Sequence, residues 1–95
     1  MTLPRPVLAW ARTFAAPDAA GQRSKDWTAR DPAHRAMFAR IYLPASGQGG
    51  WAWYVGERAN VGSGVAPTAR EAALAAEAAW FAYREREYGT PAPTE

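Results

Sequence analysis

The stretch PTAREAALAAEAAWFAYREREYG, residues 67–89, decides the fold of this chain. Thr68 has the residue type that caps helix N-termini, and Glu71 three positions later completes a capping box, in which the two residues satisfy each other's backbone donors. Gly89 suits a left-handed residue after the last turn, and Pro91 blocks continuation of the helix. The pattern therefore predicts one long helix over residues 68–88.

The helix has a face of small residues and a face of charged ones. At about 100° per residue, one side gathers Ala72, Ala75, Ala76, Ala79 and Tyr83. The opposite side gathers Arg70, Glu71, Glu77, Arg84 and Glu85. The alanine face predicts close packing on a sheet, and the glutamates are expected to form a solvated face with local ion pairs. Leu74 and Phe81 fall among the charges, so they either pack beneath the N-terminal segment or form an interaction patch for another subunit.

Between residues 26 and 66 the pattern becomes that of strands. Asp31 and Pro32 suit the first two positions of a type I turn, and the run 35–43 after it alternates apolar residues with others. Runs 51–55 and 61–65 follow after Gly-rich or polar turns. Such short connections allow only antiparallel pairing. We therefore expect an α+β fold, with a three- or four-stranded antiparallel meander over residues 26–66 packed on the long C-terminal helix.

The N-terminal part of the chain is ambiguous. Over residues 6–16, Val7, Trp10, Ala11 and Phe14 share a helical face, which favours a helix; the alternative is a strand with Leu8, Trp10 and Phe14 on one face. The whole chain is expected to be one domain, with an N-terminal segment and loop (1–25), the sheet, the helix and a tail (89–95).

Length and composition limit the classes of function that the chain can have. The chain has 95 residues and a mass of 10.3 kDa, which suits one modest core. With no Cys and a single His it cannot form a disulfide, a thiolate site or a multi-histidine metal site. No apolar run approaches the roughly 20 residues that span a bilayer. We expect a soluble, cytoplasmic protein with no membrane contact, no metal and no cofactor.

The sequence carries no catalytic constellation. Ser24, Ser46 and Ser63 have only His34 as a possible base, and His34 is expected to be exposed in a turn. The run 62–67 lacks the lysine and spacing of a phosphate-binding loop, and suits an edge strand that leads into a capped helix. We therefore expect that the protein is not an enzyme.

The second face of the sheet is the candidate site. If Met37, Ala39, Ile41 and Leu43 face the helix, then Phe38, Arg40 and Tyr42 face away. Depending on register, either Ala52 and Tyr54 or the pair Trp51 and Trp53 join them. Exposed aromatic rings and arginines on a sheet bind nucleic acid by stacking and by phosphate contacts, whereas the same rings are ordinary core if a second layer covers them.

The charge distribution is mildly favourable to such binding. The net charge is only +2, but residues 1–58 hold eight basic residues against four acidic ones. Ten of the eleven basic residues are arginine, which the base composition of a GC-rich bacterial genome explains without selection for phosphate binding.

The order of strands and capped helix, with Gly50-Trp51-Ala52-Trp53 and Thr68-Ala69-Arg70-Glu71-Ala72-Ala73, resembles the AP2 and phage-integrase arm-type DNA-binding domains. It also resembles small bacterial domains of unknown function that combine a Gly-Trp strand with this helix start. The first resemblance implies a sheet that enters the DNA major groove, with Arg40, Tyr42, Tyr54 and Arg58 facing DNA. The run 62–68 is similar to the end of double-stranded-RNA-binding domains, but Ala66, Pro67 and Ala69 replace the lysines of that family.

The sequence thus predicts a non-enzymatic nucleic-acid-binding module whose affinity falls steeply with salt, with Arg40, Tyr42, Tyr54 and Arg58 as site residues. The alternative is a protein-interaction or structural module, such as a homodimer formed through Leu74 and Phe81 or through an exposed sheet edge. A small-molecule-binding role has only the Trp-rich sheet in its favour.

Overall fold

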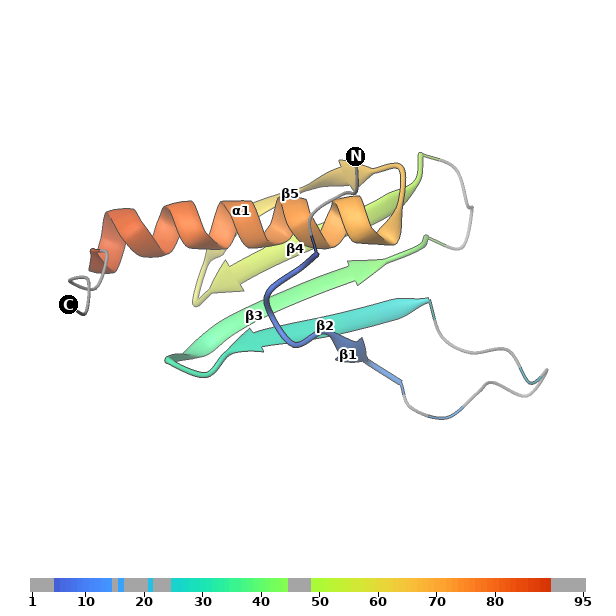
Figure 1. Ribbon diagram of the computed structural model, residues 1–95, viewed down its shortest axis with the longest axis horizontal. Helices are drawn as coiled ribbons and strands as arrows, with labels where there is room; N and C mark the ends of the chain where they lie inside the picture. The colour runs from blue at the N-terminus through green and yellow to red at the C-terminus, as the bar shows by residue number, and fades with distance from the viewer. Residues whose placement is uncertain (1–4, 15, 17–20, 22–24, 45–48, 90–95) are drawn as a thin grey trace.

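The computed structural model describes residues 5–14, 16, 21, 25–44 and 49–89. Within them the strands are β1 (Ala11–Arg12), β2 (Asp26–Asp31), β3 (His34–Tyr42), β4 (Trp51–Glu57) and β5 (Asn60–Ala66), and the helix is α1 (Ala69–Tyr88). The strands form one antiparallel sheet in the order β1-β2-β3-β4-β5, and α1 lies across one of its faces (Figure 1). The predicted α+β fold is confirmed, with one strand more than expected.

The additional strand comes from the N-terminal segment. Ala11 pairs with Thr28 and Arg12 with Trp27, so the helix that periodicity favoured over residues 6–16 is wrong for the described part of that range. The backbone N–H groups of Val7 and Leu8 donate instead to the carboxylate of Glu77 on α1, at 2.9 and 2.8 Å. A partner about 70 residues away along the chain holds this segment in a non-helical conformation, and the local sequence pattern does not reveal such a partner.

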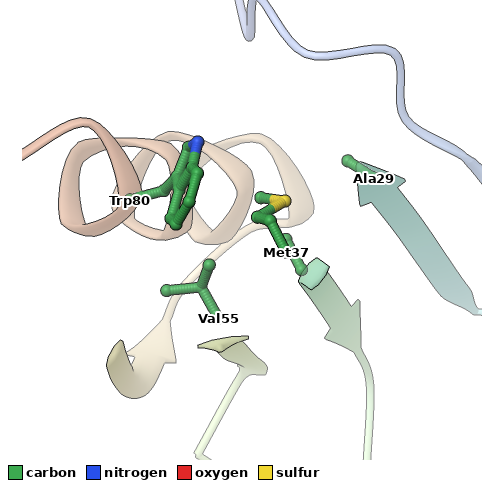
Figure 2. Packing of buried hydrophobic residues seen from close by; sticks show 5 residues of the cluster. Ala29, Met37, Val55 and Trp80 are labelled. Atoms are coloured by element: carbon green, nitrogen blue, oxygen red, sulfur yellow. The ribbon is translucent and has the colours of Figure 1, made fainter. Parts of the chain in front are cut away.

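Trp80 is the centre of the core. It is fully buried, and Figure 2 shows its indole reaching from α1 toward Met37 of β3 and Val55 of β4. Met37, Ala39 and Ile41 are all buried, so the inward alternation predicted for β3 is confirmed. Truncating a core Trp of this kind to Ala typically costs about 3–5 kcal/mol of stability.

The helix begins and ends where the sequence predicts. Thr68 is the N-cap and its hydroxyl oxygen accepts a 3.1 Å hydrogen bond from the Glu71 backbone N–H. The Glu71 carboxylate accepts from the Thr68 hydroxyl at 3.0 Å, which closes this end of the helix. At the other end, Gly89 has a φ of 77° and its N–H donates to the carbonyl of Glu85.

The inward face of α1 differs in part from the expected one. Ala72 and Ala76 are buried as expected, together with Ala73 and Trp80. The expectation that Glu77 lies on a solvated face is wrong, because this residue is only 4% exposed. Its carboxylate is satisfied by the N-terminal segment, and a buried charge with three donors is tolerated where an unpaired one is not.

Two glycines of β5 make room for a large ring. Trp53 lies opposite Gly64, and a Cβ atom on Gly64 would stand 2.8 Å from the indole Nε1. A Cβ on Gly62 would stand 3.1 Å from the Cβ of Ala79 and 3.3 Å from the Trp53 ring. Gly62 and Gly64 therefore serve packing between the sheet and α1, and the run lies in an edge strand as expected.

Asp31 and Glu57 join the sheet to the C-terminal half of α1. Asp31 accepts from the Trp80 indole and from Arg84, both at 2.9 Å, and Glu57 accepts from the Tyr88 phenol. His34 begins β3 beside them, with Nδ1 3.7 Å from Glu57 and its ring against Trp80 and Tyr88. Its side chain is 18% exposed, so the expectation of an exposed turn histidine is wrong.

The loop expected over residues 18–25, the turn over 45–50 and the tail after 89 lie largely outside the described residues. In the part of the chain that the structure describes, no helix is long and apolar enough to cross a membrane.

Candidate nucleic-acid-binding face

The sheet face opposite α1 is called the open face here. Cross-strand pairing and alternation place the following side chains on it: Thr28, Arg30, Phe38, Arg40, Tyr42, Ala52, Tyr54, Ser63 and Val65. Both α1 and the segment before β1 lie on the other side of the sheet, where Leu8 and Trp10 pack against the core that holds Trp80 (Figure 1). No segment among residues 5–14, 25–44 and 49–89 covers the open face.

The register of β4 settles which aromatic residues belong to this face. Arg40 lies opposite Tyr54, and Ile41 lies opposite Trp53. Because Ile41 is buried against α1, Trp53 shares that side and Tyr54 shares the side of Arg40. Of the two registers compatible with the sequence, the structure has the one that exposes Tyr54.

Tyr54 lies along its own strand, over a glycine. A Cβ atom on Gly56 would stand 2.5 Å from the Tyr54 hydroxyl oxygen and 3.0 Å from Cζ. The ring therefore occupies the space that a side chain at position 56 would fill, and Tyr54 is 37% exposed. The hydroxyl end of the ring therefore lies against the strand, and part of the side chain is open to solvent.

Two arginine–aromatic pairs flank Tyr54. The Arg40 guanidinium carbon lies 4.6 Å from the centroid of the Tyr42 ring, and that of Arg30 lies 5.1 Å from the centroid of the Phe38 ring. Both distances are within the range of cation–π contacts. Each guanidinium group thus lies beside a ring. Arg30 is exposed and Arg40 is partly exposed, so part of each cation is open to a ligand.

Arg40 is also held by an ion pair. Its Nε donates to both oxygens of Asp26 at 3.1 Å, its Nη2 donates to Oδ2 at 2.5 Å, and Thr13 donates to Oδ1 at 2.6 Å. Burial of Asp26 opposes its ionisation, but the hydrogen bonds from Arg40 and Thr13 and the Arg40 charge outweigh burial and lower the Asp26 pKa. The Asp26 hydrogen bonds raise the pKa of Arg40 in turn. Arg40 remains 40% exposed, so it is a positioned cation whose charge is largely balanced.

The sequence analysis missed two charged residues, Arg30 on the open face and Asp26 beside it. Asp26 lies directly opposite Tyr42, and Arg30 stands two positions after Thr28, so the alternation of β2 could have indicated both.

A hollow adjoins the open face at the short strand β1. It has a volume of about 490 Å³ and is lined by Thr13 and Arg12 from the N-terminal side and by Thr28, Arg30 and Phe38 from the sheet. It forms because β1 is only two residues long, so the outer edge of β2 beyond Thr28 has no partner strand. A second hollow, of about 360 Å³, lies on the other side of the sheet beside Trp10, Trp27 and Arg70.

The structure brings together three of the four residues predicted to bind nucleic acid. Arg40, Tyr42 and Tyr54 are neighbours on the open face. Arg58 lies in the turn after β4 with a φ of 65°, and its charge acts on the Tyr88 phenol at the end of α1.

The predicted interaction patch is partly used within the fold. Phe81 is half-buried and packs against the core cluster that Leu8 and Trp10 also contact, and Arg84 lies 4.8 Å from its ring centroid. Leu74 is half-buried as well. The position of Phe81 agrees with the alternative in which it packs beneath the N-terminal segment, whereas Leu74 belongs to neither core cluster of the described residues.

Across the described residues, no group of three or more His, Asp or Glu side chains could hold a metal ion. Comparison with protein-family models, with curated proteins and with solved structures found no match for this chain. The resemblance to arm-type domains therefore stays a prediction.

Proposed function

We propose that this protein binds nucleic acid through the open face. The observation that carries the proposal is the exposed Tyr54 side chain, whose hydroxyl end lies over Gly56 and which is flanked by the pairs Arg30–Phe38 and Arg40–Tyr42. Every base offers a π-face to an aromatic ring, and guanidinium groups both stack on bases and donate to phosphates.

Each residue has a role in this proposal. Tyr54 supplies the stacking surface, and Arg30 and Arg40 supply the cations. Phe38 and Tyr42 hold the two guanidinium groups in place. Arg58, at the end of the β4–β5 hairpin, contributes only to long-range attraction.

The proposed role is binding without catalysis. The carboxylate on this side of the sheet, Asp26, is engaged by Arg40 and Thr13, so its hydrogen-bonding capacity is taken up. Ser63 is the serine that the structure places on the open face, and its cross-strand neighbour is Tyr54 rather than a histidine or a carboxylate that could activate it.

The test is a titration of fluorescently labelled single-stranded DNA, duplex DNA and duplex RNA at low and moderate salt. Arg30→Ala is the sharpest variant, because Arg30 is exposed and makes no ion pair with another described residue. Arg86→Ala, which removes an exposed arginine from α1, is the matched control. Arg40→Ala is informative only beside a folding check, since it leaves the buried Asp26 without its cation.

We expect salt-sensitive binding that Arg30→Ala weakens and Arg86→Ala leaves unchanged. Absence of binding to every nucleic acid at low salt would contradict the proposal. In that case the open face would be examined for a protein partner by pull-down, and self-association by light scattering.

A further inference from the structure

Resting on this proposed function, we propose that the ligand is single-stranded nucleic acid, of which two successive unpaired bases cross the sheet. One base contacts the Arg30–Phe38 pair beside the hollow at β1, and the next stacks on Tyr54. The shared chemistry is an unpaired base on a phosphodiester backbone, whether the strand is DNA or RNA.

Unpaired bases suit the rings of the open face better than paired ones. Tyr54 lies opposite Arg40, so Phe38, two positions along β3, is its diagonal neighbour, and the hydroxyl end of Tyr54 lies over Gly56, which pairs with Phe38. In a duplex both faces of each base are covered by its neighbours in the stack, so a base can stack on a protein ring only after it leaves the stack. An extended single strand offers such bases without the cost of unpairing.

The charges on the open face are too few for a duplex. Its cations are Arg30 and Arg40, and Asp26 balances Arg40. A protein that binds duplex DNA by its backbone commonly makes six to ten phosphate contacts. One or two cations beside aromatic rings suit a single-stranded nucleic acid that binds mainly by stacking its bases on those rings.

The hollow gives the single-stranded nucleic acid a binding position at the edge of the sheet. At about 490 Å³ it is within the size range of small-molecule sites, and Thr28, Arg30 and Phe38 belong both to it and to the open face. Its lining includes the hydroxyl groups of Thr13 and Thr28, which lie 2.6 Å apart. Thr13 donates to Asp26 and Thr28 donates to Thr13, so their oxygens can still accept a hydrogen bond from a ribose hydroxyl or a base N–H. A nucleotide seated there is next to Phe38, one diagonal step from Tyr54.

The experiment compares oligothymidylate, oligouridylate and a blunt duplex, each of about 12 nucleotides or base pairs, by fluorescence anisotropy at about 50 and 200 mM salt. Tyr54→Leu removes the ring, and Tyr54→Phe is the matched control that keeps it. Circular dichroism and thermal unfolding show that each variant is folded.

We expect both single strands to bind more tightly than the duplex. Tyr54→Leu should weaken single-strand binding roughly 5- to 150-fold, and Tyr54→Phe should bind like the parent protein. With one or two phosphate contacts, fourfold more salt should weaken binding only about 3- to 7-fold. This is a smaller effect than the steep dependence expected from the sequence.

Two kinds of failure are distinguishable. If no nucleic acid binds at low salt, the proposed function itself is wrong. If binding occurs but the duplex is preferred, or salt weakens it roughly a thousandfold, or Tyr54→Leu has no effect, the open face binds nucleic acid by its backbone and the single-strand inference is overturned. Thymidylate and uridylate strands differ in the C5-methyl group as well as in the 2′-hydroxyl, so oligodeoxyuridylate is the third single strand, and its comparison with oligouridylate tells DNA from RNA.

Discussion

The carboxylate of Glu77, in the middle of α1, accepts a hydrogen bond of 2.8 Å from the indole Nε1 of Trp10, which lies 67 residues earlier in the chain. The same carboxylate accepts from the backbone N–H groups of Val7 and Leu8. One buried side chain thus anchors the N-terminal segment on the helix side of the sheet and leaves the opposite face open.

Glu77→Ala should destabilise the protein by about 2–3 kcal/mol, because it removes three hydrogen bonds to a buried carboxylate. Urea unfolding followed by tryptophan fluorescence measures the loss. Glu85→Ala, at an exposed position of the same helix, is the control and should change stability by less than about 0.5 kcal/mol. Equal losses in the two variants would show that the Glu77 contacts contribute nothing.

Acid should destabilise the protein through Asp31. Burial opposes its ionisation, but hydrogen bonds from Trp80, the Ala33 N–H and Arg84, together with the Arg84 charge, outweigh burial and lower the Asp31 pKa. Because the folded state has the lower pKa, the stabilisation is present above the unfolded value near 4 and is lost as pH falls below it. As the pH falls through 7, 5, 4 and 3, the urea midpoint should decrease more steeply for the parent protein than for Asp31→Asn. The pH dependence that remains in the variant should include the contribution of Asp26. Parallel curves would rule out this role of Asp31.

Gly64→Ala should destabilise the protein by about 1–3 kcal/mol. The new Cβ would stand 2.8–2.9 Å from the Trp53 indole, and that ring has little freedom to move because it packs against both core clusters. Ser63→Ala, on the exposed side of the same strand, is the control and should be nearly neutral. A Gly64→Ala protein as stable as the parent would mean that the sheet and α1 separate easily at this point.

Tyr88 should ionise late in an alkaline titration. Its hydrogen bond to Glu57, reinforced by the loss of solvent around the phenol and by the Glu57 charge, raises the pKa of Tyr88 to about 12. Since the unfolded phenol ionises near pH 10, stability should decline as pH rises from about 10 to about 12. Tyrosinate absorbance of the parent protein and of Tyr88→Phe measures the effect. If Tyr88→Phe removes part of the absorbance change that the parent protein shows near pH 10, the hydrogen bond to Glu57 is absent in solution.

Replacing Gly56 should disturb the open face without unfolding the protein. A methyl group at position 56 would clash chiefly with the end of the Tyr54 ring, which can rotate away from the sheet. It would also make a tight contact with the carbonyl oxygen of Ala59. Gly56→Ala should therefore lower stability by no more than about 1 kcal/mol while it weakens nucleic-acid binding in the direction of Tyr54→Leu. Unchanged nucleic-acid binding would show that binding does not require the Tyr54 ring to lie over Gly56.

Within the candidate site, the alternation of β3 was enough to group Phe38, Arg40 and Tyr42, because residues two apart on a strand share a face. It could not show that Asp26 balances Arg40, since that contact crosses from one strand to another over 14 positions of sequence. Nor could it choose between Tyr54 and Trp53, because a shift of register by one residue exchanges the two faces of β4.

The sequence by itself determined the elements whose signals are local. The cap at Thr68, the glycine at position 89 and the period of two along β3 act within a few residues, and the helix and strand follow from them. Only the tertiary structure decided that residues 7–12 are not helical, that Glu77 is buried and that Tyr54 is exposed. These outcomes depend on hydrogen-bond partners and on packing between segments far apart in the chain, and the free energy of such contacts outweighs the preference of any single stretch.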